Sequence, residues 1–277
     1  MTFSAFSKHY PHVLHNPDSP ILEVNKLTVR YGEQSALENI SFHLHAGERV
    51  AVVGPNGAGK STLFKVVAGV LPATSGEVKI SGHGPNGHIC IAYVPQRSQV
   101  DWRFPANVAD VVMMGRIGQI GFFRWPSRSD WSAVHAALEV VDMNSLANRQ
   151  IGELSGGQQQ RTFLARALAQ ESELVLMDEP LNGLDLPSQE SILVLLEKLR
   201  QQKITVMVAT HDLGQAASHF ERVLLLNRRL IRFGPPLEVL TSENLLLAYR
   251  GHAQVIQNFD GTTTLADSCC TGEEENE

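Results

Sequence analysis

The stretch Gly54-Pro55-Asn56-Gly57-Ala58-Gly59-Lys60-Ser61-Thr62 decides the fold of this chain. It matches the whole G-x-x-x-x-G-K-[ST] pattern of a phosphate-binding loop. The apolar residues 50–53 before it predict a buried strand, and residues 63–69 after it predict a helix closed by glycine. In that setting the glycines let backbone N–H groups surround an anion, and the helix N-terminus adds partial positive charge. We therefore expect Lys60 to reach the β- and γ-phosphates of a nucleotide and Ser61 to bind Mg²⁺.

A second apolar strand, residues 174–177, runs into Asp178-Glu179-Pro180. Beside a phosphate loop, the Asp is expected to bind Mg²⁺ through water and the Glu to polarise the attacking water. The alternative is a strand that ends in a solvated acidic turn. Thr210-His211-Asp212 follows a further buried strand, residues 204–209, at the strand end where open α/β sheets bind ligands.

The remaining pattern predicts an α/β protein with two additions to its nucleotide core. Residues 21–31 and 40–44 alternate as strands and predict an antiparallel β layer, and residues 76–81 and 89–94 predict further strands. Residues 97–170 contain helical patterns and no convincing strand, which indicates an inserted helical subdomain. The other expected elements are helices at 107–114, 129–141, 158–169, 190–199, 236–240 and 243–249, and hairpins at 223–233 and 254–265.

Composition favours a cytosolic globular protein of 277 residues without a nucleic-acid partner. The formal net charge is −6, and Glu273, Glu274, Glu275 and Glu277 supply much of it. No apolar run approaches the roughly 18 residues of a membrane span, and we see no signal-peptide core. Residues 1–20 are expected to form a flexible extension and residues 252–277 an extension with an acidic tail. The histidines at 9, 12 and 15 and the pair Cys269-Cys270 leave a metal site as an alternative to inert tails.

Between the two nucleotide motifs lies Leu154-Ser155-Gly156-Gly157-Gln158-Gln159-Gln160-Arg161, which resembles the signature sequence of ATP-binding cassette (ABC) ATPases. The order of the three motifs is also that of the family. Tyr31, Gln96, Asp185 and His211 match the family's A-loop, Q-loop, D-loop and H-loop positions. The resemblance covers residues 21–250 and implies an ABC ATPase domain over 21–251 with a RecA-like P-loop core.

The resemblance implies a site shared between two subunits of a head-to-tail dimer that encloses two ATP molecules with Mg²⁺. Residues 54–62 and Tyr31 would bind ATP, and Ser61, Gln96 and Asp178 would hold Mg²⁺. Glu179 would be the general base, with His211 and Gln96 acting beside it. Residues Ser155, Gly156, Gly157 and Gln158 would meet the nucleotide of the other subunit, at the start of a helix expected near Gln158. The D-loop stretch 181–185 departs slightly from the family's commonest form, so communication between the two sites is less firmly implied than hydrolysis.

A finer resemblance concerns residues 93–105, 111–116 and 121–126, which look like bacterial importers of manganese, zinc or ferrous iron. It implies a separate membrane permease, a solute-binding protein that acts indirectly outside the membrane, and a peripheral position on the cytoplasmic face. We expect manganese as cargo, with a zinc or iron-chelate importer as the alternative. Trp102, Phe104 or Phe122 would anchor the permease if exposed, or else pack within the helical subdomain.

Two other kinds of ABC protein remain as alternatives. A soluble cassette ATPase acting on ribosomes or DNA usually carries two cassettes, a coiled-coil insertion or basic patches. A non-catalytic scaffold would have lost the lysine, glutamate or histidine of the site, whereas Lys60, Glu179 and His211 are all present.

Overall fold

The computed structural model describes residues 19–84, 91–121 and 124–249 in full, and the backbone of two further strands. The strands are β1 (Leu22–Tyr31), β2 (Gln34–Leu44), β3 (Arg49–Val53), β4 (Ser75–Ile80), β5 (Ile91–Val94), β6 (Leu174–Asp178), β7 (Thr205–Thr210), β8 (Arg222–Asn227), β9 (Arg229–Gly234), β10 (Ala253–Gln257) and β11 (Thr263–Asp267). The α-helices are α1 (Lys60–Val67), α2 (Val108–Met113), α3 (Ile117–Ile120), α4 (Arg128–Val140), α5 (Gly156–Ala169), α6 (Leu186–Gln201), α7 (Leu213–His219), α8 (Pro236–Val239) and α9 (Ser242–Ala248). None of the helices in this described part combines the length and apolarity needed to cross a bilayer.

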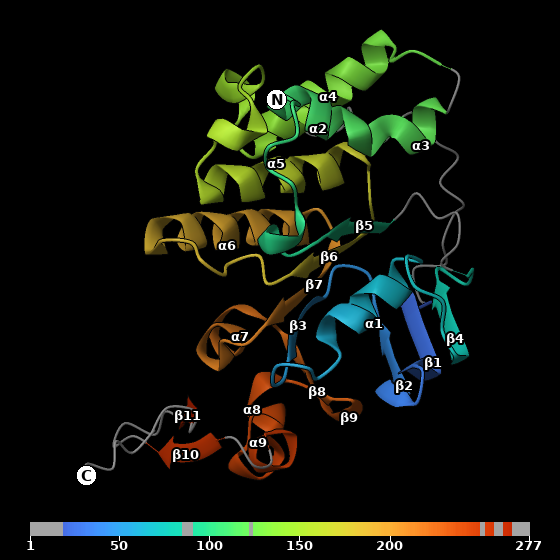
Figure 1. Ribbon diagram of the computed structural model, residues 1–277, viewed down its shortest axis with the longest axis vertical. Coiled ribbons are helices and arrows are strands. Elements are labelled where there is room, and N and C mark those ends of the chain that lie inside the picture. The colour runs from blue at the N-terminus through green and yellow to red at the C-terminus, as the bar shows by residue number, and fades with distance from the viewer. Residues whose placement is uncertain (1–18, 85–90, 122–123, 250–252, 258–262, 268–277) are drawn as a thin grey trace, which may run out of the picture.

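The central sheet has the strand order β5-β6-β7-β3-β8-β9. The first five strands are parallel, and β9 closes one edge as an antiparallel hairpin with β8. In Figure 1 the sheet runs through the middle of the molecule. On one side of it lies the helical part, which comprises α2 to α5, and on the other lie the strands β1, β2 and β4. Because parallel strands end at the same edge, the loops after β3, β5, β6 and β7 gather there.

Apolar cores cover both faces of this sheet, which explains why its strands are continuously apolar. In β3, Ala51 and Val53 join the core formed with the helices, while Val50 and Val52 join the core formed with α1 and the small sheet. All four side chains are fully buried. The strand before the phosphate loop is therefore held from both sides and places the loop rigidly.

The antiparallel layer expected from the first strands is present as a three-stranded sheet with the order β2-β1-β4. The pair β1–β2 carries register shifts between Val24 and Leu27 and again near Val29, so β1 is not a regular strand. Strand β2 also packs against β9, which joins the small sheet to the edge of the central one.

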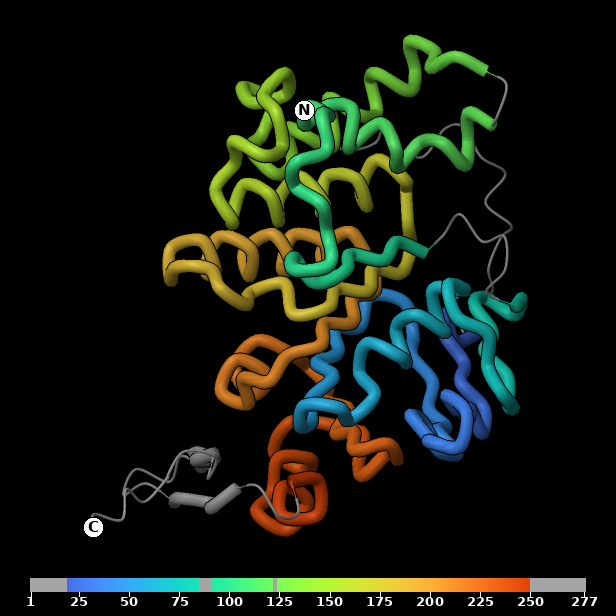
Figure 2. Tube along the Cα trace, in the orientation of Figure 1, coloured from blue at the N-terminus to red at the C-terminus, as the bar shows by residue number. Residues whose placement is uncertain are grey.

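The helical part leaves the central sheet after β5 and returns to it at β6 (Figure 2). Helix α5 packs against α2, α4 and α6. Inside this part Arg116 is buried and pairs with Asp130 (Nε to Oδ1, 3.2 Å) and Glu171 (Nη1 to Oε1, 3.1 Å). Burial alone would raise the pKa of Asp130, but hydrogen bonds from Ser127 and the Arg116 guanidinium hold it below its usual value.

Most expected elements are present, with differences at their ends. Helix α5 begins at Gly156 rather than near Gln158, since Ser155 caps it, and α6 begins at Leu186 rather than at 190. Helices α3 and α7 were not expected, because both are too short to show a clear helical pattern in the sequence. Helix α7 follows the ligand-binding end of β7. The predicted hairpin near residues 254–265 is confirmed by the antiparallel pair β10–β11.

The domain limits taken from the sequence stay a prediction. Residues 1–18, with His9, His12 and His15, lie outside the described residues, and so do Phe122 and the pair Cys269-Cys270.

Candidate active site

The phosphate loop joins β3 to α1 and is shaped by two close backbone approaches. A Cβ on Gly54 would lie 2.0 Å from the carbonyl oxygen of Leu226, and a Cβ on Gly59 would lie 2.6 Å from that of Ala36. Both glycines also adopt positive φ angles, +156° and +97°. Strands β8 and β2 therefore press on the loop so closely that only glycine fits at these positions.

Lys60, the first residue of α1, is buried and turned back over the loop. Its Nζ donates to the carbonyl oxygens of Gly54 (2.7 Å) and Pro55 (3.1 Å). Burial lowers the pKa of Lys60, while the carboxylates of Glu179 and Asp178 act in the opposite direction. The ammonium group is thus held at the carboxyl edge of the sheet, between the loop and the two acids.

Asp178 ends β6 and is almost completely buried. Burial is the main cause that raises the pKa of its carboxyl, and a hydrogen bond from the Ser61 hydroxyl partly offsets it. Its Oδ2 has no hydrogen-bond partner in the described part of the chain. A buried, unpartnered carboxylate oxygen beside a hydroxyl is costly by itself and suits a hard cation such as Mg²⁺, which takes oxygen ligands.

The phenol of Tyr93, on the neighbouring strand β5, has a raised pKa, first because it is buried and then because Asp178 is near. Its hydroxyl also has no hydrogen-bond partner among the described residues. The carboxyl group of Asp178, expected from the sequence to hold Mg²⁺, therefore lies near a buried phenol on the neighbouring strand.

Glu179 follows directly and sits at a positive φ of 48°, where the chain turns away from β6. Its Oε2 accepts hydrogen bonds from Gln96 Nε2 (3.0 Å) and Asn182 Nδ2 (2.9 Å). Gln96 reaches it because β5 and β6 are adjacent and parallel, with Val94 opposite Met177. This role of Asn182 was not predicted from the sequence, where the only signal was its position three residues after Glu179 in a turn.

His211 follows β7 and lines a small pocket together with Glu179, Asn182 and Asp212. His211 is exposed. Tyr31 ends β1 and is 53% exposed, which leaves it accessible for stacking on an adenine. The structure therefore brings residues Lys60, Ser61, Gln96, Asp178, Glu179 and His211 to one edge, with Tyr31 at the end of the small sheet.

The predicted signature residues lie elsewhere in the same chain. Ser155 caps α5 in a reciprocal box with Gln158: its N–H donates to Gln158 Oε1 (3.0 Å), and its Oγ accepts from the Gln158 N–H (3.4 Å). Helix α5 packs against α2, α4, α6 and β5, whereas α1 packs against β2 and β6. Among the described residues, the signature and the phosphate loop therefore lie on helices that pack against different elements.

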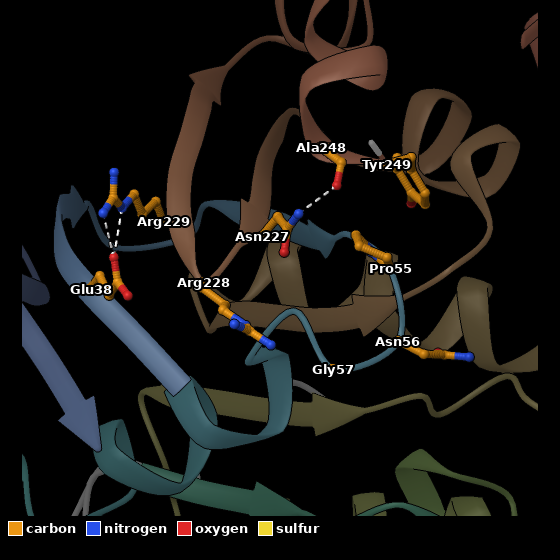
Figure 3. A pocket seen from close by; sticks show the side chains of 9 residues that line it. All are labelled: Glu38, Pro55, Asn56, Gly57, Asn227, Arg228, Arg229, Ala248 and Tyr249. Atoms are coloured by element: carbon orange, nitrogen blue, oxygen red, sulfur yellow. Dashed lines mark hydrogen bonds and ion pairs between the residues drawn. The ribbon is translucent and has the colours of Figure 1, made fainter. Parts of the chain in front are cut away.

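A pocket of about 440 Å³ flanks the outer side of the phosphate loop. Figure 3 shows it between Pro55, Asn56 and Gly57 of the loop, the turn from β8 to β9 and the end of α9. Arg229 is neutralised by Glu38 (Nη2 to Oε2, 2.6 Å), while Arg228 extends toward the loop that carries Gly57. The backbone N–H of Arg228 also donates to the Ala58 carbonyl (2.9 Å), so this turn supports the loop from outside.

The aromatic residues proposed as permease anchors differ in exposure. Trp102 is partly buried, packs edge-on against Phe163 and donates from Nε1 to the Arg97 carbonyl (3.0 Å), so it belongs to the helical part. Of the two alternatives left open for Trp102, the structure favours packing within the helical subdomain. Phe104, the other candidate among the described residues, is 55% exposed, and Trp125, which was not proposed as an anchor, is 92% exposed.

The fold and this edge define a P-loop ATPase with an inserted helical subdomain. Residues 37–182 match the family model described as "ABC transporter". The chain therefore belongs to the ABC transporter family, as an ATP-binding cassette with ATPase activity. The resemblance and the fold class inferred from the sequence are both confirmed.

Two relatives and two solved structures illustrate the similarity. The "Manganese transport system ATP-binding protein MntB" of Halalkalibacterium halodurans is 45% identical over 87% of this chain and 97% of its own. The "Zinc transport system ATP-binding protein TroB" of Treponema pallidum is 44% identical over 83% of this chain and 87% of its own. An ABC transporter of proposed metal-chelate type, solved in an inward-facing conformation, is 32% identical, with a TM-score of 0.76 over 90% of this chain and 98% of that one. A dimeric ATP-binding cassette bound to ADP and phosphate in a post-hydrolysis state is 28% identical, with a TM-score of 0.67 over 78% of this chain and 98% of that one.

Proposed function

We propose that this chain is the ATP-hydrolysing subunit of an ABC importer that powers uptake of a divalent metal. The cargo that we propose first is manganese, and the alternative is zinc or an iron chelate. The observation that carries the hydrolytic part is the convergence of Lys60, Asp178 and the Gln96–Glu179 pair at one sheet edge. The metal part is supported by relatives at about 45% identity named for manganese and at 44% for zinc.

Each side chain at the edge has a role that its position supports. Lys60 would exchange its bonds to the loop carbonyls for the β- and γ-phosphates of ATP. Ser61, Asp178 and Gln96 would hold Mg²⁺, which when bound neutralises developing charge on the phosphate oxygens. Glu179 would take the proton of the attacking water, and His211 would hold that water and the γ-phosphate in place.

We propose a head-to-tail homodimer in which residues 155–158 complete the nucleotide site of the other subunit. Within one chain, α5 and α1 pack against different elements. This supports the arrangement, because the signature at the start of α5 would not contact the nucleotide bound by the phosphate loop of the same chain. The N-terminus of α5, a helix of 14 residues, offers N–H groups and positive partial charge to a γ-phosphate. The dimeric relative bound to ADP and phosphate is consistent with it.

The remaining partners are proposed on chemical grounds. A transmembrane permease would dock on the segment after Gln96, where Phe104 offers an exposed aromatic ring. That contact would hold the subunit at the cytoplasmic face of the membrane, and a metal-binding protein outside the membrane would act indirectly. The competing function is a soluble cassette ATPase, in which case the chain would co-sediment with ribosomes rather than depend on a permease.

The test compares whole-cell metal content in the source organism for the parent and a Glu179→Gln variant under metal limitation. Glu139→Gln, an exposed glutamate of α4, is the matched control and should change nothing. Selective loss of manganese supports the proposal, whereas selective loss of zinc or iron keeps the mechanism and changes the cargo. Abolished hydrolysis with every metal unchanged would contradict the importer.

The same variant tests the chemical role of Glu179 in isolation. Glu179→Gln should accumulate as an ATP-bound dimer with little turnover, measured by size-exclusion chromatography and phosphate release. A variant that stays monomeric at millimolar ATP, or hydrolyses at the parent rate, would refute that role.

A further inference from the structure

Glu179 is held by two carboxamide groups that come from different parts of the chain. Gln96 Nε2 and Asn182 Nδ2 both donate to the same oxygen, Oε2, at 3.0 and 2.9 Å. Among the described residues, none donates a side-chain hydrogen bond to Oε1 of Glu179. The carboxylate is therefore held through one oxygen, and the other remains available to a water molecule.

Asn182 also forms a hydrogen bond with the backbone of Glu179. Its N–H donates to the Glu179 carbonyl at 3.2 Å, while the Glu179 N–H donates to the Ala209 carbonyl of β7 at 3.0 Å. These bonds fix the turn in which Glu179 adopts its positive φ of 48°. Backbone and side chain of Asn182 thus act together on the direction in which the carboxylate points.

The two amides are not equivalent. Gln96 donates to Glu179 through Nε2, so its carbonyl oxygen faces elsewhere and is the end that suits Mg²⁺. Gln96 also lies on the segment that leads into the helical part, 83 residues from Glu179 in the sequence. Asn182 lies three residues away in the same turn, so its grip does not depend on how that segment moves.

We propose that Asn182 is a positioning residue for the general base: its carboxamide orients Glu179 so that Oε1 faces the attacking water. This inference rests on the proposed role of Glu179. It gives a purpose to the departure of residues 181–185 from the family's commonest D-loop form, since the carboxamide at 182 supplies a second N–H donor to the base.

The competing explanation is that Asn182, which is exposed, serves contacts between subunits or only the shape of the loop. A positioning role lowers kcat and leaves ATP affinity and dimer formation as they are. If Asn182 serves contacts between subunits, its variants should form less dimer. If it serves only the shape of the loop, variants of other residues that hold the stretch 181–189 should lower kcat as well.

The experiment measures kcat and KM for ATP with the full chain, together with dimer formation on a non-hydrolysable ATP analogue. Asn182→Ala should lower kcat about three- to tenfold, because a hydrogen bond to a charged group is lost at a partly solvated site. Asn182→Asp, of the same shape, should lower kcat more than tenfold, since it replaces the donor by a second negative charge facing Oε2. KM and dimer formation should stay within about twofold for both.

Gln189→Ala is the matched control. Gln189 Nε2 donates a hydrogen bond to the Leu184 carbonyl (3.0 Å) in the stretch that follows Asn182, and not to Glu179. It should keep the parent kcat. Parent-like kcat in both Asn182 variants, equal losses in the Gln189 control, or a parallel loss of dimer formation would each overturn the inference.

The outcome for Glu179 itself separates the two proposals. If Glu179→Gln hydrolyses ATP at the parent rate, the proposed role of the base fails whatever Asn182 does. If Glu179→Gln is inactive while both Asn182 variants are fully active, only the positioning inference fails.

Discussion

Gly157, the second residue of α5, is a position where the signature is constrained by its own subunit. A Cβ added to Gly157 would lie 2.6 Å from Oγ and 2.9 Å from Cβ of Ser188, in the first turn of α6. The hydroxyl can rotate away, but the Ser188 Cβ is fixed to the backbone. The two helices therefore approach more closely here than any side chain on Gly157 allows.

Gly157→Ala should lower the free energy of unfolding by about 1 kcal/mol. Overpacking a tight contact costs about 1–3 kcal/mol, and replacing glycine by alanine in a helix returns up to about 1 kcal/mol. At roughly 2–4 °C per kcal/mol for a chain of this size, the midpoint of thermal unfolding should fall by a few degrees. The measurement is a thermal melt followed by circular dichroism, with urea unfolding as the second probe.

Two further variants make the reasoning testable. Ser188→Gly removes both close atoms, so Gly157→Ala in that background should be neutral or slightly stabilising. Gly156→Ala is the control: its Cβ would approach Arg97 Nη1 and Leu184 Cδ2 at 3.0 Å, both ends of flexible side chains, and should cost less. The same loss from Gly157→Ala with and without Ser188→Gly would refute a contact-based cause.

Three shorter predictions concern nucleotide binding, dimer closure and pH. Lys60→Ala should weaken ATP binding at least about tenfold by fluorescent-nucleotide titration, because a charge-assisted phosphate contact is lost, while Lys65→Ala one turn along α1 should not; equal affinity in both would contradict the assignment. Ser155→Arg, placed in a Glu179→Gln background, should abolish the ATP-induced dimer on size exclusion yet leave ATP binding to the single chain intact; loss of binding as well would place the signature at its own site. Because the pKa of Asp130 is lowered in the fold, its stabilisation is complete above its ordinary value near 4 and disappears as the pH falls through the lower folded value. The difference in urea midpoint between the parent and Asp130→Asn should therefore be largest at pH 7 and shrink as the pH falls below about 4, and a difference that does not shrink between pH 7 and about pH 2 would exclude this cause.

The local motifs of the site were predictable because their chemistry lies within a few consecutive residues. The phosphate loop needs glycines, Lys60 and Ser61 in one order, and Asp178-Glu179 needs only an apolar strand before it. Helix α5 starts two residues before the predicted position, because Ser155 caps the helix and Gly156 and Gly157 already belong to its first turn. The sequence also left open whether an aromatic residue faces solvent, and for Trp102 the structure decides for packing, because Phe163 lies beside it.

The kind of chemistry follows from the sequence alone: a nucleotide held by backbone N–H groups, an acid pair at a strand end and a signature stretch at the start of a helix. What the tertiary structure alone decided is which groups meet. The order β5-β6-β7-β3 brings Gln96 to Glu179 and sets Lys60 opposite both acids, although these residues come from separate segments. The packing of α5 on α6 brings Gly157 to Ser188 in the same way. The physical reason is that parallel strands end at a common edge whatever their separation in the chain, and close packing then sets the distances between their side chains.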